Sequence, residues 1–280
     1  MRYTIKDFKA EYPDDDACLE ALFQNRFGDV KFCPKCAAET KFYRVKKRQC
    51  YACMHCGYQL HPLAQTIFRK SSTSLWNWFY AIYLFSVAKN GVSAKELERQ
   101  LGVTYKTAWR MAKQIRLLMA QELEPLTGTV EVDETYYGGK TKGHSRYENK
   151  IPIIGGVEKN GLAKAKVNPW MDKHVAKAFL QANVEPDVYL HTDDSAIYRW
   201  VKKEFKHGVV NHSEGHYVQK GVSTNTIEGL WSQLKRSMDG TYHVVSPKYL
   251  QSYVDEFVFR YNYRALAVCP LLLERAARPF

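Results

Sequence analysis

Residues 130–140, VEVDETYYGGK, gather three acidic side chains in a chain that is otherwise strongly basic. Apolar and acidic residues alternate here, and a period of two is typical of a β-strand with one apolar and one polar face. Glu131 and Asp133 share the polar face, so we expect Glu131 to act as a partner of Asp133. Glu134 points to the opposite face, where we expect a structural role or a place at the rim.

The residues that follow predict the rest of an α/β domain. Two further strand-like runs, within residues 151–167, are joined at Asn160-Gly161, a dipeptide favoured in hairpin turns. A helix is predicted over residues 171–182 and a returning strand over residues 187–194, DVYLHTDD. Three antiparallel strands, a helix and a strand beside the first would bring the carboxylates of VEVDE and HTDD together. This is the layout of a ribonuclease-H-like domain, a mixed sheet with flanking helices.

The composition favours a folded protein with a polyanionic partner. The chain has 280 residues, 45% of them apolar, which suffices for one large domain or two to three small ones. Lys and Arg outnumber Asp and Glu by 41 to 29, a formal charge of +12 that is spread along the chain. Nucleic acid fits such a charge better than a membrane surface, although the same charge also suits a protein that merely stays soluble.

Neither export nor membrane insertion is expected. The first residues contain no apolar core of the length of a secretory signal, so we expect the mature chain to begin at Met1. The longest apolar run, residues 74–88, is shorter than the roughly 20 residues of a spanning helix and contains Asn77, which favours a buried helix. Two C-x-x-C pairs without an export signal indicate a reducing compartment, most simply a cytoplasm.

Four of the seven cysteines predict one structural zinc ion. Cys33 and Cys36 form one C-x-x-C pair and Cys53 and Cys56 form the other, with 16 residues between the pairs, a spacing typical of four-cysteine zinc sites. Cys50 is an alternative ligand, because it lies three residues before Cys53. We prefer Cys53 and Cys56, since a glycine follows Cys56 and suits the tight turn behind a zinc knuckle.

Two basic segments are predicted to contact DNA. The loop between the cysteine pairs carries Lys46, Lys47 and Arg48, although a solvated face would also explain such a charge run. Residues 93–119 hold two amphipathic helices around a glycine, which favours a helix-turn-helix over an ordinary helical hairpin and makes Thr104 the cap of the second helix. The start of that helix exposes the side chains expected to read DNA: Tyr105, Lys106, Thr107 and Arg110.

These patterns divide the chain into four segments. The segments are an N-terminal helical segment (residues 1–30), a zinc ribbon (31–70), a helical region with the helix-turn-helix (71–124) and a catalytic domain (125–280). The turn-rich sequence EPLTGT, residues 124–129, is read as the linker before the last segment.

A helix predicted within residues 223–238 supplies a third acidic residue. Glu228 and Lys235 are seven positions apart, so they lie on one side of that helix and two turns apart. Taken alone, each acidic residue here is more often a cap or a surface charge. Together, Asp133, Asp193 and Glu228 form the best available trio for two Mg²⁺ or Mn²⁺ ions, an arrangement that cleaves and transfers phosphodiesters. The basic residues expected to reach toward a phosphate are Lys235 and Arg236.

The sequence as a whole resembles a known family. The resemblance is to the IS1595-family insertion-sequence transposases with an ISXO2-like DDE domain, and it runs from the first helix to about Arg264. It implies a bacterial, nucleoid-associated DNA transposase with a ribonuclease-H-like catalytic domain behind a zinc ribbon and a helix-turn-helix. It also implies that Asp133, Asp193 and Glu228 are the acidic triad, followed by the basic Lys235. The stretches that carry it are CPKC…CMHCGYQLHPLAQTIFRKSST, GVSAKELERQLGVTYKTAWRM, VEVDETYYGGK, HTDDSAIY and TNTIEGLWSQLKRSMDGTYHVVSPKYLQSYVDEFVFRYNYR.

Two positions of the triad have alternatives. Asp194 competes with Asp193, which we prefer because it shares a strand face with Tyr189 and His191. Asn225 competes with Glu228, since the family includes asparagine at the third position; Glu228 is preferred for its charge and its spacing to Lys235. A neighbouring pair, Asn211 and His212, is a further candidate for the site.

Three functions are weighed on these residues. The first is a transposase that binds the inverted repeats at the ends of its own element as a homodimer or higher oligomer, frees a 3′-hydroxyl by hydrolysis and joins it to target double-stranded DNA. The second is an inactive or regulatory DNA-binding protein, which the intact acidic pattern disfavours. The third is another ribonuclease-H-like nuclease, which the zinc ribbon and helix-turn-helix disfavour, because selective end binding is a transposase need.

Overall fold

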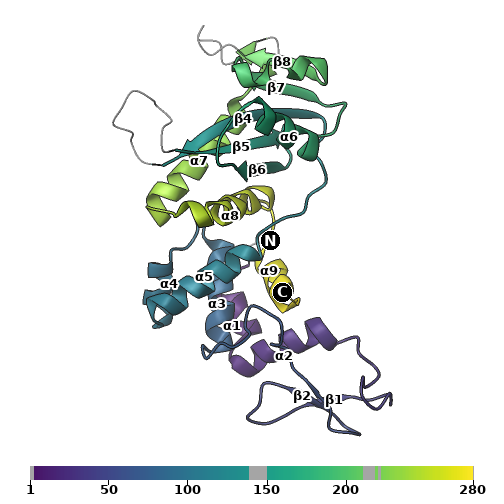
Figure 1. Cartoon of the computed structure of the whole chain (residues 1–280). Coiled ribbons are helices and arrows are strands. Elements are labelled where there is room, and N and C mark those ends of the chain that lie inside the picture. Colours follow the sequence, from purple (N-terminus) through teal and green to yellow (C-terminus); the bar gives the residue numbers. More distant parts are fainter. Residues whose placement is uncertain (1–2, 139–149, 211–217, 220–221, 280) are drawn as a thin grey trace. The chain divides into compact units, whose positions relative to one another are not determined.

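The computed structural model describes residues 3–138, 150–210, 218–219 and 222–279, and Asn211 and His212 lie outside this part of the chain. Contacts divide the chain into two compact units (Figure 1): unit 1 comprises Met1–Met119 and Ala265–Phe280, and unit 2 comprises Ala120–Arg264. Within the described ranges, no helix combines the length and the apolar character needed to cross a membrane.

Unit 1 is built mainly from helices with capped first turns. Thr4 and Asp7 form a capping box at the first helix, and Asp14 caps the second by accepting a hydrogen bond from the backbone N–H of Ala17 at 2.8 Å. Helix α2 therefore begins within the acidic run that follows Pro13. The helices are α1 (Ile5–Glu11), α2 (Asp15–Phe27), α3 (Leu75–Val87), α4 (Ala94–Leu101), α5 (Tyr105–Leu117) and α9 (Cys269–Ala277).

Helices α4 and α5 are joined by a three-residue turn. Gly102 ends α4 with a φ of 64°, a left-handed conformation that glycine adopts without a steric penalty. Thr104 caps α5 by accepting a hydrogen bond from the backbone N–H of Thr107 at 3.4 Å, which confirms the expected cap. Leu97 of α4 and Met111 of α5 are completely buried, so the pair has the amphipathic faces that the sequence predicts.

A small antiparallel sheet follows α2 in unit 1. Its strands β1 (Phe42–Arg44), β2 (Tyr51–Cys53) and β3 (Gln59–Leu60) pair in the order β1-β2-β3. The ring of Tyr51 stacks on that of Phe23 with 3.8 Å between centroids, and its hydroxyl donates a hydrogen bond to Glu20 at 2.5 Å. The sheet therefore shares its core with α2.

Unit 2 is organised around a five-stranded mixed sheet. The strand order is β6-β5-β4-β7-β8, with β4 antiparallel to β5, β5 antiparallel to β6, and both β4–β7 and β7–β8 parallel. The acidic stretch thus lies on the central strand, and the expected mixed sheet with a returning strand beside the first is confirmed. The strands are β4 (Thr129–Tyr137), β5 (Ile151–Glu158), β6 (Ala163–Val167), β7 (Tyr189–Asp193) and β8 (Lys206–Val210), with a separate pair β9 (Val218–Gln219) and β10 (Val222–Ser223).

Helices pack on both faces of this sheet and form two apolar clusters (Figure 1). One face packs against α6 (Lys173–Asn183), which begins two residues later than predicted because Asp172 caps it. The other face packs against α7 (Asn225–Ser237) and α8 (Leu250–Asn262). Short helical turns complete the unit at Ala196–Tyr198, Val201–Lys203, Met238–Tyr242 and Pro247–Tyr249.

Side chains of α8 bind the outer edge of strand β6. The amide of Asn262 accepts a hydrogen bond from the N–H of Ala163 at 2.8 Å and donates one to its carbonyl at 3.0 Å. Gln251 accepts from the N–H of Val167 at 2.8 Å and donates to the carbonyl of Ala165 at 3.3 Å. These amides take the place that a neighbouring strand would have on an open sheet edge.

Helix α7 approaches the sheet closely at Gly155 of β5. A Cβ atom on Gly155 would lie 2.5 Å from the Cη2 atom of Trp231, and a real structure does not tolerate such a distance. Gly155 pairs with Asp133 across β4 and β5, so the indole ring covers the sheet beside the acidic residue. Glycine is therefore required at position 155 for α7 to pack against the sheet at this distance.

Gly155→Ala is expected to destabilise unit 2 by about 1–3 kcal/mol, because it overpacks the contact with Trp231. Urea unfolding measures this change. Gly229→Ala is the control: it lies within α7, has no atom within 4 Å of the added Cβ, and should raise stability by about 0.5–1 kcal/mol. Equal effects of the two substitutions would contradict the close contact.

The last helix packs with unit 1 and not with the unit that precedes it in sequence. Cys269, Leu272 and Leu273 of α9 are buried, and α9 contacts α2 and α3. The predicted catalytic segment extends through this region to residue 280, because the apolar periodicity of the last helix does not indicate which core the helix enters. The four predicted segment boundaries remain predictions, whereas the contacts divide the chain after residues 119 and 264.

Candidate functional site

Asp133 and Asp193 lie level on neighbouring strands. Strands β4 and β7 pair in parallel up to Glu131 and His191, and Asp133 and Asp193 each follow two residues after this last pair. Both side chains are half-buried. The Oδ1 atom of Asp193 accepts a hydrogen bond from the backbone N–H of Ser195 at 3.1 Å, which orients the carboxylate at the end of its strand.

The environment of Asp133 strongly disfavours its negative charge. Burial raises the pKa of Asp133 to about 8 from an ordinary value of 3.8. The negative charges of Glu134, Asp193 and Glu228 act in the same direction. A carboxylate that is buried among other carboxylates favours a divalent cation, and an all-oxygen set of donors suits Mg²⁺ or Mn²⁺.

Glu228 lies in the first turn of α7. Its Oε1 atom accepts a hydrogen bond from the hydroxyl of Thr224 at 2.8 Å, and its side chain is half-buried. The first turn of α7 is bonded to Glu131 of β4, and the charge of Glu228 acts on Asp133, so the helix brings this carboxylate near Asp133. Three elements that are far apart in sequence thus meet at one place in unit 2.

The two alternative ligands have more exposed side chains. Asp194 lies past the end of β7, and Asn225 is the first residue of α7. The acidic residues whose charges raise the pKa of Asp133 include Asp193 and Glu228. This electrostatic relation favours Asp193 and Glu228 as the partners of Asp133.

The three carboxylates do not form a compact group of the kind that surrounds a bound ion. Among the described residues, the only group of three or more metal-binding side chains with all ligand atoms within 4.8 Å is a cluster of cysteines.

Two basic side chains follow Glu228 on α7. Lys235 and Arg236 lie in the last turn of the helix and are exposed. The Nε atom of Arg236 donates a hydrogen bond to the carbonyl of Ser232 at 3.4 Å. Both cations are therefore available to a ligand in solution, two turns beyond the acidic residue.

Glu131 has a clear structural task that its sequence position only partly predicts. Its side chain is 2% exposed and accepts hydrogen bonds from the backbone N–H groups of Thr226 and Ile227 at 2.7 and 3.0 Å. It shares the face of Asp133, as expected, but its donors belong to the first turn of α7. The alternation of residues within β4 indicates which face Glu131 lies on, but it does not indicate that its hydrogen-bond donors come from α7.

Glu134 lies on the opposite face of β4, as predicted, where it is bonded to a fully buried tyrosine. The hydroxyl of Tyr198 donates a hydrogen bond to its Oε2 atom at 2.7 Å. Burial raises the pKa of Glu134, while this hydrogen bond acts against the increase. The pair ties the short helical turn after β7 to the central strand, a contact that the sequence does not indicate.

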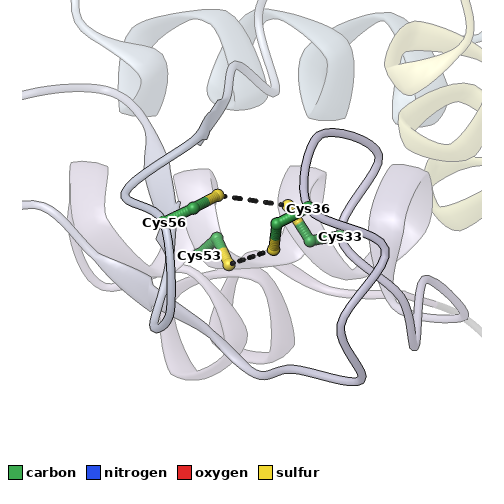
Figure 2. Close-up of side chains that lie close together, drawn as sticks. All are labelled: Cys33, Cys36, Cys53 and Cys56. Atoms are coloured by element: carbon green, nitrogen blue, oxygen red, sulfur yellow. Dashed lines mark hydrogen bonds between the residues drawn. The ribbon is translucent and has the colours of Figure 1, made fainter.

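Four cysteines of unit 1 converge from two loops (Figure 2). The Sγ atoms of Cys33 and Cys56 are 3.6 Å apart, those of Cys36 and Cys53 are 3.9 Å apart, and all four lie within 4.8 Å of one another. A tetrahedron with Zn–S bonds of about 2.3 Å has S···S edges of about 3.8 Å. The four thiols therefore fit one Zn²⁺ ion.

The two C-x-x-C loops share one backbone pattern. In each, the first cysteine carbonyl accepts a hydrogen bond from the residue after the second cysteine, Ala37 at 2.9 Å and Gly57 at 3.0 Å. These residues have φ values of 53° and 70°, so the left-handed turn expected at Gly57 is confirmed. Burial disfavours the Cys53 thiolate, but the N–H of Cys56 and the hydroxyl of Thr40 lower its pKa to about 6.

Cys50 lies outside this cluster. Its thiol is buried and donates a hydrogen bond to the Oε1 atom of Gln59 at 3.6 Å. The alternative register with Cys50 as a ligand is therefore not what the loops form, because the knuckle turn follows Cys56.

The residues predicted to bind DNA are in part exposed and in part bonded within the protein. Lys46, Lys47 and Arg48 are exposed at the turn between β1 and β2, and Tyr105 and Lys106 are exposed at the start of α5. In contrast, the guanidinium of Arg110 donates a hydrogen bond to the carbonyl of Arg69 at 2.7 Å, and the hydroxyl of Thr107 is 3.1 Å from that of Thr104.

Comparisons with known proteins agree with these two sites. The chain matches an ISXO2-like transposase domain over residues 125–262 and a transposase zinc-ribbon domain of the IS1595 type over residues 13–59. An uncharacterized protein in the transposable element ISH50 of Halobacterium salinarum is 26% identical over 270 residues, covering 85% of this chain and 88% of the relative.

One solved structure, of a simian T-cell lymphotropic virus intasome in complex with the PP2A regulatory subunit B56 gamma, matches with a TM-score of 0.32 and 12% identity. The match covers 63% of this chain and 64% of that chain, less than two thirds of its length. A similarity of this size carries no argument.

The matched zinc-ribbon domain contains the cysteine cluster, and the matched transposase domain contains all three carboxylates. A transposase zinc ribbon followed by an ISXO2-like transposase domain makes this chain a member of the IS1595 family of insertion-sequence transposases.

Proposed function

We propose that the protein is a DNA transposase that binds the ends of its own insertion sequence and catalyses metal-dependent strand cleavage and strand transfer in unit 2. The observation that carries the proposal is the meeting of Asp133, Asp193 and Glu228 from two adjacent strands and a helix. Burial and the neighbouring carboxylates raise the pKa of Asp133 to about 8, a cost that a bound cation would remove.

The sheet supports a ribonuclease-H-like assignment for unit 2. Its order β6-β5-β4-β7-β8, with three antiparallel strands and two parallel ones, puts Asp133 on the central strand and Asp193 at the end of its neighbour. Helices on both faces complete the layout expected from the sequence. We infer that α7 provides the third acidic residue in this arrangement.

In the proposed mechanism, Asp133, Asp193 and Glu228 hold two Mg²⁺ or Mn²⁺ ions. The chemistry that bound ions would supply is activation of the attacking water or 3′-hydroxyl and stabilisation of the leaving oxygen. The protein orients the carboxylates: Ser195 fixes Asp193 and Thr224 fixes Glu228 by the hydrogen bonds described above. Lys235 and Arg236 neutralise the DNA phosphates that approach the acidic centre.

Unit 1 is proposed to bind the element ends. The three-residue turn between α4 and α5 and the exposed Tyr105 and Lys106 support a helix-turn-helix whose second helix enters the major groove. The zinc ribbon adds phosphate contacts through Lys46, Lys47 and Arg48. Because two ends must be held at once, we propose a homodimer or higher oligomer on double-stranded DNA.

The test is a strand cleavage and joining assay with the purified chain. DNA that carries the inverted repeats flanking the gene should be nicked and joined to a target plasmid when Mg²⁺ or Mn²⁺ is present, and DNA with scrambled ends should not. Binding to the ends without any cleavage under either metal would favour the regulatory alternative. Cleavage without preference for the ends would favour a nuclease.

DNA binding should weaken steeply with salt, because phosphate contacts release counterions. Replacing Lys46, Lys47 and Arg48 by Ala should reduce the slope of log K against log salt by about 3 and weaken all sequences alike. Lys106→Ala at the start of α5 should instead reduce the preference for element ends. Filter binding or fluorescence anisotropy at several salt concentrations measures both effects, and an unchanged slope in the triple variant would remove the ribbon from the DNA interface.

A further inference from the structure

The buried carboxylate of Glu131 binds the N-terminus of α7. Its Oε2 atom accepts hydrogen bonds from the backbone N–H groups of Thr226 at 2.7 Å and Ile227 at 3.0 Å. Its Oε1 atom accepts from the hydroxyls of Ser223 at 3.1 Å and Thr226 at 3.0 Å. Four donors from one segment thus converge on a side chain that is 2% exposed.

This carboxylate replaces the cap that α7 does not obtain from its own sequence. The first N–H groups of a helix need acceptors, and a Ser, Thr, Asp or Asn just before the helix commonly supplies one. Thr224 occupies that position but caps no backbone group, and its hydroxyl donates to Glu228 instead. The acceptor comes from Glu131, 95 residues earlier than Thr226 in the chain.

A second attachment lies one turn further along α7. Trp231 packs against Gly155, the residue that pairs with Asp133 across the sheet. Glu228 lies between this contact and the residues that Glu131 binds. Two fixed points on either side of Glu228 determine both the rotation of the helix and its height above β4.

The chain just before α7 is held by the neighbouring strand. The Nδ1 atom of His191 lies 3.2 Å from the carbonyl oxygen and 3.3 Å from the nitrogen of Ser223. His191 pairs with Glu131 in the β4–β7 register, so both contacts come from the same level of the sheet. The entry of α7 is therefore fixed by two adjacent strands, and these are the strands that carry Asp133 and Asp193.

We propose that Glu131 is a positioning residue: it docks the first turn of α7 on β4 and so places Glu228 opposite Asp133 for metal binding. The inference rests on the proposed function, since it concerns the same metal site. Glu131 is not itself assigned as a ligand, because each of its oxygens already accepts two hydrogen bonds from the protein.

The role can be tested first without metal, by amide hydrogen exchange in the full chain. In Glu131→Ala the amides of Thr226 and Ile227 lose their acceptor, so the peptide at the start of α7 should exchange at least about tenfold faster. Glu131→Gln should stay near the wild type, because its carbonyl oxygen can accept the two N–H bonds while its NH₂ group donates to the two hydroxyls. Unchanged exchange in Glu131→Ala would overturn the inference.

The second readout is Mn²⁺ affinity, measured by the electron paramagnetic resonance of free Mn²⁺. Residues that orient metal ligands are worth about 10- to 100-fold in affinity, so Glu131→Ala should weaken binding by at least about tenfold. Glu131→Gln should remain within about threefold of the wild type. If Gln were as weak as Ala, the charge and not the docking would matter, and the positioning role would be wrong.

Glu256→Gln is the matched control for general destabilisation. Glu256 is also 2% exposed in unit 2, but it accepts hydrogen bonds from Tyr242 and Arg260, which lie outside α7. Its substitution should leave Mn²⁺ affinity within about twofold. If Glu131→Ala fails to fold, Thr226→Ala removes one of the four bonds and should give smaller changes of both readouts in the same direction; wild-type values for it would overturn the inference.

Glu228→Gln separates the two proposals. If it weakens Mn²⁺ binding while a folded Glu131→Ala does not, the metal site stands and the positioning role is wrong. If Glu228→Gln itself leaves Mn²⁺ affinity unchanged, the metal site is wrong and the inference falls with it.

Discussion

Asp133→Asn should abolish strand cleavage and joining and, at the same time, make the metal-free protein more stable. The loss of activity should exceed about 100-fold, because even residues behind a metal ligand are worth about 10- to 100-fold. End binding should persist, since the proposed DNA-reading surfaces lie in unit 1. Glu228→Gln should show the same separation of cleavage from binding, and full activity of both variants would contradict the two-metal proposal.

The gain in stability follows from the pKa of Asp133. Its value of about 8 in the folded state lies above the ordinary 3.8, so folding takes up a proton between these pH values and stability falls as pH rises through this window. Asparagine removes the free-energy cost of a buried charge at this position. The gain in stability is complete above about pH 8 and absent below about pH 4. Calorimetry without divalent cations should show the melting temperature of unit 2 rising by about 2–4 °C for each kcal/mol gained. An Asp133→Asn variant that is less stable than the wild type at pH 8 would contradict the expected gain in stability.

Loss of zinc should unfold the cysteine-rich module. Binding of Zn²⁺ in such small modules supplies about 10–16 kcal/mol, which is also their folding energy, and β1 to β3 offer little core of their own. Because Tyr51 stacks on Phe23, the disorder should extend into α2. Chelation or Cys36→Ser should release one Zn²⁺ per chain, and both should increase amide exchange over residues 15–60.

Cys50→Ala is the matched control within the same module. Cys50 is buried but lies outside the cluster, so this variant should keep one zinc ion per chain and lose only packing energy and the hydrogen bond to Gln59. Zinc content by mass spectrometry distinguishes the two substitutions. Retention of zinc by Cys36→Ser together with its loss from Cys50→Ala would mean that the ligand register is shifted.

Local patterns of the sequence predicted the local structure well. The alternation around Asp133 gave the strand and its faces, the C-x-x-C spacing gave the cysteine cluster, and Thr104 gave the start of α5. Each of these signals lies within a few residues, where periodicity or capping chemistry acts directly. The roles of Asp133, Asp193 and Glu228 stay predictions, supported by the geometry and the charges at the site.

Contacts between distant residues left no such pattern. The bonds from Glu131 to Thr226 and Ile227 join residues 95 and 96 positions apart, and both partners look ordinary in their own segments. The packing of α9 with unit 1 was missed for the same reason, since an amphipathic helix records that one face is buried and not against what. Tertiary contacts that use single side chains have to be read from the structure.

The amide side chains along β6 restrict how two copies of the protein could come together. Asn262 and Gln251 occupy backbone groups of Ala163, Ala165 and Val167 that would otherwise recruit a strand from another molecule. A continuous sheet across two subunits is therefore disfavoured at this border. An assembly that pairs two DNA ends would have to associate through other surfaces, and the folded protein is protected from edge-to-edge aggregation along β6.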